Sequence, residues 1–153
     1  MFNIVLVEPQ IPPNTGNVAR SCAASGARLH LVGKLGFSID DRQLKRAGLD
    51  YWHLLDVECH DSLEALWRKN PAGRFHYLST KGGTLYHDVS YTQGDFIVFG
   101  KETTGLPDDL LAAKRDSTFR IPMIHGARSL NLSNAVAVVL FEGLRQLGFP
   151  EMS

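Results

Sequence analysis

Three short segments combine glycine, small hydroxyl or amide residues and one or two charged side chains, as ligand-binding loops do. They read NTGNVAR at residues 14–20, FGKETTGLP at 99–107 and RSLNLSN at 128–134. Glycine lets a ligand approach the backbone closely because it has no Cβ, and serine or asparagine side chains can bond loop amides. Three such loops in a chain of 153 residues predict a binding site built largely from backbone groups.

Other common kinds of chemistry are not indicated. The chain has no G-x-G-x-x-G or G-x-x-x-x-G-K-[ST] loop for phosphates and no G-x-S-x-G nucleophile turn. Its six histidines form no H-x-x-x-H pair and show no carboxylate partner at metal spacing, so no metal is predicted. Cys22 and Cys59 lie in no ligand spacing, and we expect both to be reduced thiols.

Composition is that of an ordinary globular protein, with 44% hydrophobic and 21% charged residues. The 16 basic residues balance the 16 acidic ones, which argues against bulk electrostatic binding of nucleic acid. Residues 1–50 carry six basic and four acidic side chains, which is compatible with a modest basic face or with ion pairs along a helix. No run of 18 apolar residues and no signal peptide is found, so we expect a cytoplasmic protein without a membrane span.

The elements that must position these loops alternate between strand and helix. Strands are predicted at residues 4–7, 28–32, 54–57, 75–79, 95–99 and 118–121. Helices are predicted from residue 14 or 15 to about 25, from 40 or 41 to about 48, and over 62–69, 107–113 and 132–147. Three prolines predict that residues 8–13 are not helical. The alternation predicts a single α/β domain over residues 1–153, with a mostly parallel sheet flanked by helices.

Taken together, the loops resemble the signature motifs of the SPOUT superfamily of RNA methyltransferases. Within it, the chain is similar to small stand-alone members that methylate the wobble-nucleotide ribose of tRNA. The resemblance covers essentially the whole chain and rests on EPQIPPNTGN at residues 8–17, RAGLDY at 46–51 and SLNLSNA at 129–135. It implies a C-terminal deep trefoil knot, although physical priors run against knots in proteins.

The resemblance also implies a cofactor site. In that family, S-adenosylmethionine is bound in a bent conformation within the knot, mainly by backbone groups. Carried over position by position, the cofactor contacts fall at Leu78, Gly100, Ile121 and Ser129. From the sequence alone, Leu78 and Ile121 would be interpreted as strand core.

The catalytic residues implied are Arg20 and Asn14. Arginine stays protonated in proteins and is a poor base, so we expect Arg20 to bind a backbone phosphate through its two-pronged guanidinium. That phosphate or a water then accepts the proton of the ribose hydroxyl. Asn14 shapes the same pocket, and Glu102 orients loop amides or pairs with an arginine of a partner subunit. Phe141 stands where relatives often carry tyrosine.

The implied activity is 2′-O-methylation of the wobble nucleotide, a cytidine or modified uridine of leucine tRNAs, by a homodimer joined through its first and last helices. The last helix is apolar around most of its circumference and must be covered on more than one side. Two alternatives stay open. In the first, the protein is a methyltransferase of the same class that acts on ribosomal RNA ribose or on a base nitrogen. In the second, the chain is a non-catalytic α/β nucleotide-binding module.

Overall fold

The computed structural model describes residues 1–40, 42, 46 and 53–153. Its centre is a seven-stranded sheet with the strand order β3-β2-β1-β6-β4-β7-β5, and every pair of neighbours is parallel. The strands are β1 Asn3–Val7, β2 Arg28–Val32, β3 Val57–His60, β4 Phe75–Leu78, β5 Thr84–Leu85, β6 Phe96–Phe99 and β7 Thr118–Arg120. The prediction of an α/β domain with a parallel sheet is confirmed.

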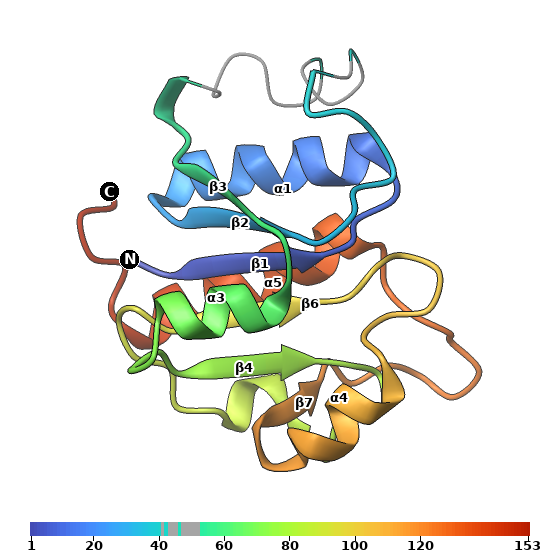
Figure 1. Cartoon of the computed structure of the whole chain (residues 1–153). Coiled ribbons are helices and arrows are strands. Elements are labelled where there is room, and N and C mark those ends of the chain that lie inside the picture. Colours follow the sequence, from blue (N-terminus) through green and yellow to red (C-terminus); the bar gives the residue numbers. More distant parts are fainter. Residues whose placement is uncertain (41, 43–45, 47–52) are drawn as a thin grey trace.

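Helices cover both faces of this sheet (Figure 1). They are α1 Pro12–Ser25, α3 Leu63–Lys69, α4 Asp108–Ala113 and α5 Leu132–Gln146, with 3-10 turns η2 Tyr86–Asp88 and η3 Arg115–Ser117. The helices α1 and α5 pack side by side behind the sheet, while α3 lies in front of it with α4 on the same side. In the described part of the chain, no helix is long and apolar enough to cross a membrane.

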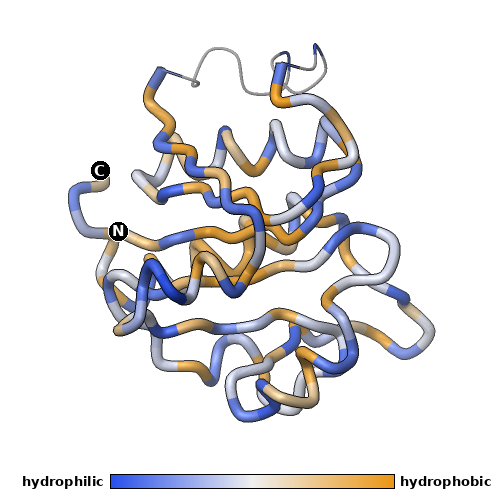
Figure 2. The backbone as a smooth tube through the Cα atoms, viewed as in Figure 1, coloured by the Kyte–Doolittle hydropathy of each residue, from blue (hydrophilic) through white to orange (hydrophobic). Residues whose placement is uncertain are grey.

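The central strands are buried on both faces, as a parallel sheet requires. Along β1, Ile4 and Leu6 pack toward α1 and α5, whereas Val5 packs toward α3. Figure 2 shows the resulting hydrophobic band along β1. The segment Leu132–Gln146 is a helix, as predicted, although valine favours strands. Its Val136 and Val139 are fully buried on the rear face of the sheet.

The first helix begins earlier than predicted. It starts at Pro12, so the expectation that residues 8–13 are not helical is wrong for its last two positions. Pro12 and Pro13 occupy the first turn, where a backbone N–H would have no partner within the helix. Neither Asn14 nor Thr15 is the N-cap; that position is Ile11, and its side chain makes no capping bond.

The third strand lies further along the chain than predicted. It runs over Val57–His60 instead of residues 54–57, and Leu54 is 63% exposed. Pairing with β2 sets this position, because Val57 lies opposite Leu29 and His60 opposite Val32. An edge strand with polar residues at alternate positions has no continuous apolar run to mark it. The helix predicted from residue 40 or 41 to about 48, and most of the RAGLDY segment, lie outside the described residues.

Candidate active site

A cavity of about 520 Å³ lies where β4, β6 and β7 end. Its walls are formed by residues 78–81 after β4, 99–106 after β6 and parts of 121–132 after β7, together with Ile11 and Asn14 from the start of α1. Ligands of open parallel sheets bind outside the carboxyl ends of the strands, and the volume is within the roughly 300–1,000 Å³ of small-molecule sites. The three loops singled out by sequence therefore contribute to one cavity.

Most of the residues carried over from the family meet there. Asn14, Leu78, Gly100, Ile121 and Ser129 all line the cavity. Arg20 is not among the lining residues and is exposed on α1, six positions beyond Asn14. The structure thus brings together five of the six predicted site residues within one chain, while the sixth, Arg20, lies further along α1 and outside the lining.

The loop after β6 folds back tightly on itself at Gly100. A Cβ on this residue would lie 2.1 Å from the carbonyl carbon of Gly105 and 2.2 Å from the amide nitrogen of Leu106. The turn is closed by a bond from the Gly105 N–H to the Lys101 carbonyl oxygen, at 2.9 Å. Gly100 is therefore required by the packing of its own loop, independently of any ligand.

Glu102 joins this loop to the segment before α1. Its Oε2 accepts a hydrogen bond from the Gln10 N–H at 2.8 Å, and its Oε1 accepts one from the Ile11 N–H at 3.0 Å. The side-chain amide of Asn14 donates to the same Oε1 at 3.4 Å. Thr103 adds a second connection, because its hydroxyl donates to Gln10 Oε1 at 2.8 Å. The expectation that Glu102 orients loop amides is confirmed, while the role of Gln10 was missed.

Asn131 joins the third loop to the same place. Its Nδ2 donates to Asn14 Oδ1 at 3.0 Å, while its Oδ1 accepts bonds from the N–H and the hydroxyl of Ser133 at 3.0 and 2.6 Å. It also accepts the Asn134 N–H at 3.3 Å, so Asn131 is the N-cap of α5. Asn14, only 8% exposed, therefore donates to one loop and accepts from another.

The lining is suited to a nucleoside with a polar tail. Leu78, Leu106 and Ile121 provide apolar walls on which a flat base can lie, and Ser129 is among the polar residues of the lining. Because Glu102 already accepts bonds from two backbone amides, its carboxylate serves to hold the walls in position.

The fold is an α/β domain with helices on both faces of a parallel sheet and a cavity at the carboxyl ends of its strands. The model of the SpoU rRNA Methylase family matches residues 1–141, and the chain belongs to that family. It is accordingly a methyltransferase. Over 150 residues the chain is 51% identical to the tRNA (cytidine(34)-2′-O)-methyltransferase of Saccharophagus degradans, covering 97% of both chains.

Solved structures of RNA methyltransferases superpose on this chain, in agreement with the family match. One described as "Structural insights into the 2-OH methylation of C/U34 on tRNA" superposes with a TM-score of 0.92 at 44% identity and covers 97% of each chain. The SpoU methyltransferase AviRb from Streptomyces viridochromogenes, in complex with the cofactor AdoMet, superposes with a TM-score of 0.86 at 26% identity. That match covers 95% of this chain and 60% of AviRb.

Proposed function

We propose that this protein transfers a methyl group from S-adenosylmethionine to the ribose 2′-oxygen of nucleotide 34 in tRNA, in the cytoplasm where that RNA is used. The observation that carries the proposal is the cavity in which five of the six expected site residues meet. The choice of tRNA and of nucleotide 34 is supported by the name of the relative that is 51% identical over nearly the whole chain.

Leu78, Gly100, Ile121 and Ser129 would hold the cofactor. When bound, S-adenosylmethionine supplies a methyl group on a positively charged sulfur, which is already a strong electrophile. The protein is then required chiefly to align the ribose hydroxyl and to exclude water. Such positioning of reactants can contribute about 7–11 kcal/mol to the lowering of a barrier. A site with walls fixed by Glu102 and Asn131 is built for that task.

Arg20 would bind the RNA. Its guanidinium would hold a backbone phosphate through two parallel hydrogen bonds, and a phosphate oxygen or a water would accept the proton of the 2′-hydroxyl. Asn14 would keep the cavity wall in place beside it. Because Arg20 does not line the cavity of its own chain, we propose that it serves the cavity of a second subunit.

The proposed partner is a second copy, packed through α1 and α5. These helices already lie side by side on one face of the sheet. On α5, Val138 and Phe141 are 38% and 41% exposed although the rest of the helix is largely buried and apolar. An apolar helix with such an outer face is expected to be covered by another surface. Phe141 would then contribute contact area where relatives often carry tyrosine.

We also propose that the chain between β7 and α5 passes through the loop that follows β6, which would make the C-terminal trefoil knot of the SPOUT fold. Support comes from the shared cavity, because residues 99–106 and 121–132 line it together. The bond between Asn131 and Asn14 holds the end of that segment against α1.

The decisive experiment is methyl transfer from tritiated S-adenosylmethionine to unfractionated tRNA, followed by nuclease digestion and nucleoside mass spectrometry. The expected product is 2′-O-methylated cytidine or modified uridine that maps to position 34 of leucine tRNAs. Label in ribosomal RNA or on a base nitrogen would instead support the alternative targets. Binding of S-adenosylhomocysteine by calorimetry, with no transfer to any RNA, would identify a non-catalytic module.

A further inference from the structure

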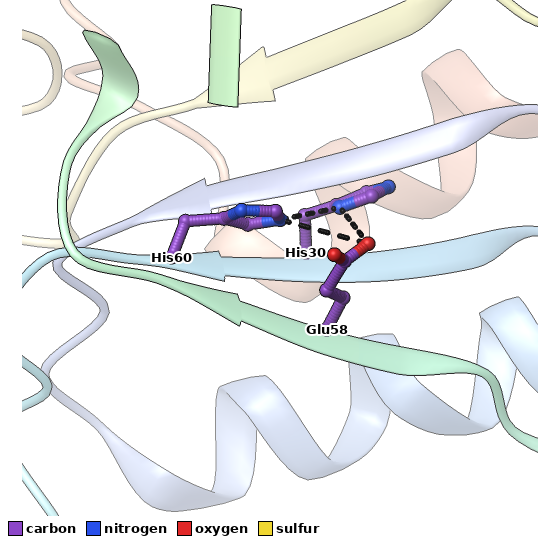
Figure 3. Close-up of side chains that lie close together, drawn as sticks. All are labelled: His30, Glu58 and His60. Carbon is purple, nitrogen blue, oxygen red and sulfur yellow. Dashed lines mark hydrogen bonds and ion pairs between the residues drawn. The ribbon is translucent and has the colours of Figure 1, made fainter. Parts of the chain in front are cut away.

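A second group of chemically active side chains lies at the other side of the sheet. His30 of β2 and Glu58 and His60 of β3 converge on the face away from α1, as Figure 3 shows. Parallel pairing causes this, because His30 lies opposite Glu58 and the two β3 residues are two positions apart on the same face. The expectation that no histidine has a carboxylate partner at metal spacing is wrong here, since pairing of β2 with β3 brings His30 beside Glu58 and His60.

The donor atoms are spaced almost as a metal ion requires. His30 Nδ1 lies 2.9 Å from His60 Nε2, and Glu58 Oε2 lies 3.8 Å from the former atom and 3.9 Å from the latter. Tetrahedral Zn²⁺ with bonds of about 2.0–2.1 Å separates its ligand atoms by roughly 3.3–3.5 Å. Shifts of about half an ångström, well within side-chain rotation, would therefore bring all three atoms to bonding distance.

The tautomer of His30 is set by its other neighbour. Asn3 donates its Nδ2–H to the Gly94 carbonyl oxygen at 3.0 Å, so its Oδ1 is the atom that faces His30 Nε2, also at 3.0 Å. Only an N–H on Nε2 satisfies that oxygen, and Nδ1 consequently carries a lone pair directed at the cluster. A ring nitrogen that donates to an oxygen while the other is available to bind is the usual arrangement of a metal-binding histidine.

Burial and charge are compatible with an ion at this place. The side chains of His30 and His60 are 2% and 5% exposed, while Glu58 is 28% exposed and leaves a route from solvent. Burial lowers the pKa of His30 to about 4 and also lowers the pKa of His60, so both imidazoles are neutral at pH 7. Lys69 forms an ion pair with Glu58 Oε1, which leaves Oε2 facing the imidazoles.

We propose that His30 Nδ1, His60 Nε2 and Glu58 Oε2 bind a transition-metal ion of the Zn²⁺ class, with water completing the coordination. Imidazole ligands suit zinc, copper and nickel, whereas magnesium and calcium prefer oxygen. On binding, the proton of His60 resides on Nδ1 instead of Nε2, and no net proton is released. The ion would join β2 to the edge strand β3, away from the methyl-transfer cavity.

The test is titration of chelator-stripped protein with Zn²⁺ in competition with a chromogenic chelator. We expect one ion per chain, and the substitutions His60→Ala and Glu58→Gln should each weaken binding by at least about 10–100-fold, the loss typical of even an outer-sphere partner. Asn3→Ala retains all three ligands and should weaken binding within that range. The matched control is His87→Ala, which removes an exposed histidine that also lies beside a carboxylate, Asp88.

Replacement of Zn²⁺ by Co²⁺ supplies an independent readout, because tetrahedral cobalt absorbs strongly in the visible range. Circular dichroism of each variant establishes that it folds. Glu58→Gln is the substitution least expected to disturb folding, because Glu58 is partly exposed. The proposal is overturned if the folded protein shows no saturable binding at millimolar Zn²⁺. It is overturned equally if binding persists unchanged in His60→Ala and Glu58→Gln. The cluster would then be a hydrogen-bonded histidine pair only.

Discussion

The side chain of Asn131 donates a hydrogen bond to Oδ1 of Asn14 at 3.0 Å, across 117 positions of the chain. This bond joins the N-cap of α5 to the first turn of α1 at the edge of the cavity. Asn14 in turn donates to Glu102. A continuous chain of hydrogen bonds therefore links the loop before α5, the start of α1 and the loop after β6.

Removal of Asn131 tests that link. We expect Asn131→Ala to lower the free energy of unfolding by about 0.5–2 kcal/mol, the usual loss for an N-cap, and to raise the KM for S-adenosylmethionine. Urea denaturation and methyl-transfer kinetics measure the two effects. Asn134→Ala is the matched control, because Asn134 makes its bond through a backbone N–H that the substitution keeps. Wild-type stability and KM in Asn131→Ala would contradict the roles given to the cap and to the bond with Asn14.

Glu102→Gln tests whether the Glu102 carboxylate holds the loop after β6 against the segment before α1. Both carboxylate oxygens accept bonds from backbone N–H groups, so a glutamine would place its own N–H₂ against one of these donors. We expect a loss of about 1–3 kcal/mol in stability and weaker cofactor binding by calorimetry. Glu151→Gln, which changes an exposed acidic residue outside the helices, should change neither quantity. Wild-type cofactor affinity in Glu102→Gln would contradict the structural role given to this residue.

Arg20→Ala separates binding of RNA from binding of the cofactor. We expect kcat/KM for tRNA to fall by at least about 100-fold, because the phosphate loses its anchor, while the affinity for S-adenosylhomocysteine changes by no more than a few-fold. Arg20→Lys keeps the positive charge but loses the planar guanidinium that can make two parallel hydrogen bonds, so this variant should retain partial activity. Full activity of Arg20→Ala in single-turnover assays would remove Arg20 from the mechanism.

A mixed form of the proposed dimer tests whether Arg20 acts across subunits. Ser129→Tyr fills the cavity of its own chain but leaves Arg20 intact, and Arg20→Ala does the reverse. Each homodimer should be inactive. Dimers assembled from one chain of each kind should regain activity, since one cavity then has an intact lining and an arginine from its partner. No recovery in a mixed dimer verified by mass spectrometry would indicate that Arg20 acts within its own chain.

The stability of the fold should depend on pH through Asp95. Burial raises the pKa of this carboxyl, but bonds from His76 at 2.8 Å and from the N–H and hydroxyl of Thr92, both at 2.9 Å, outweigh it, and the net pKa is lowered. The ionised form therefore stabilises the folded state above the ordinary pKa of about 4, and this contribution is lost as the pH falls through the lowered value.

Urea denaturation between about pH 3 and pH 7 measures this contribution. Asp95→Asn should flatten the acid side of the stability profile and cost about 1–3 kcal/mol at neutral pH, where a buried set of donors loses its charged acceptor. Asp61→Asn, at an exposed position, serves as the control and should leave the profile unchanged. If the free energy of unfolding of Asp95→Asn decreased at low pH as it does in the wild type, the role given to this carboxylate would be contradicted.

Much of the architecture follows from local patterns. The continuous apolar run of β6 predicts a strand inside the sheet, and β6 indeed lies between β1 and β4. Ser62 predicts the start of α3 and accepts the Ala65 N–H at 3.1 Å. The weaker predictions were those that depend on neighbours, such as β3, whose bounds are set by its register with β2.

The sequence by itself determined the alternation of strands and helices, the three loops and, through resemblance, the residues around the cavity. These depend on interactions within a few positions, such as the period of apolar residues and the backbone geometry of proline and glycine. Tertiary structure alone decided which residues meet: Asn131 with Asn14, Glu102 with Gln10, and His30 with Glu58 and His60. Strand order and register set those distances, because side chains from remote segments become neighbours only once the sheet has paired.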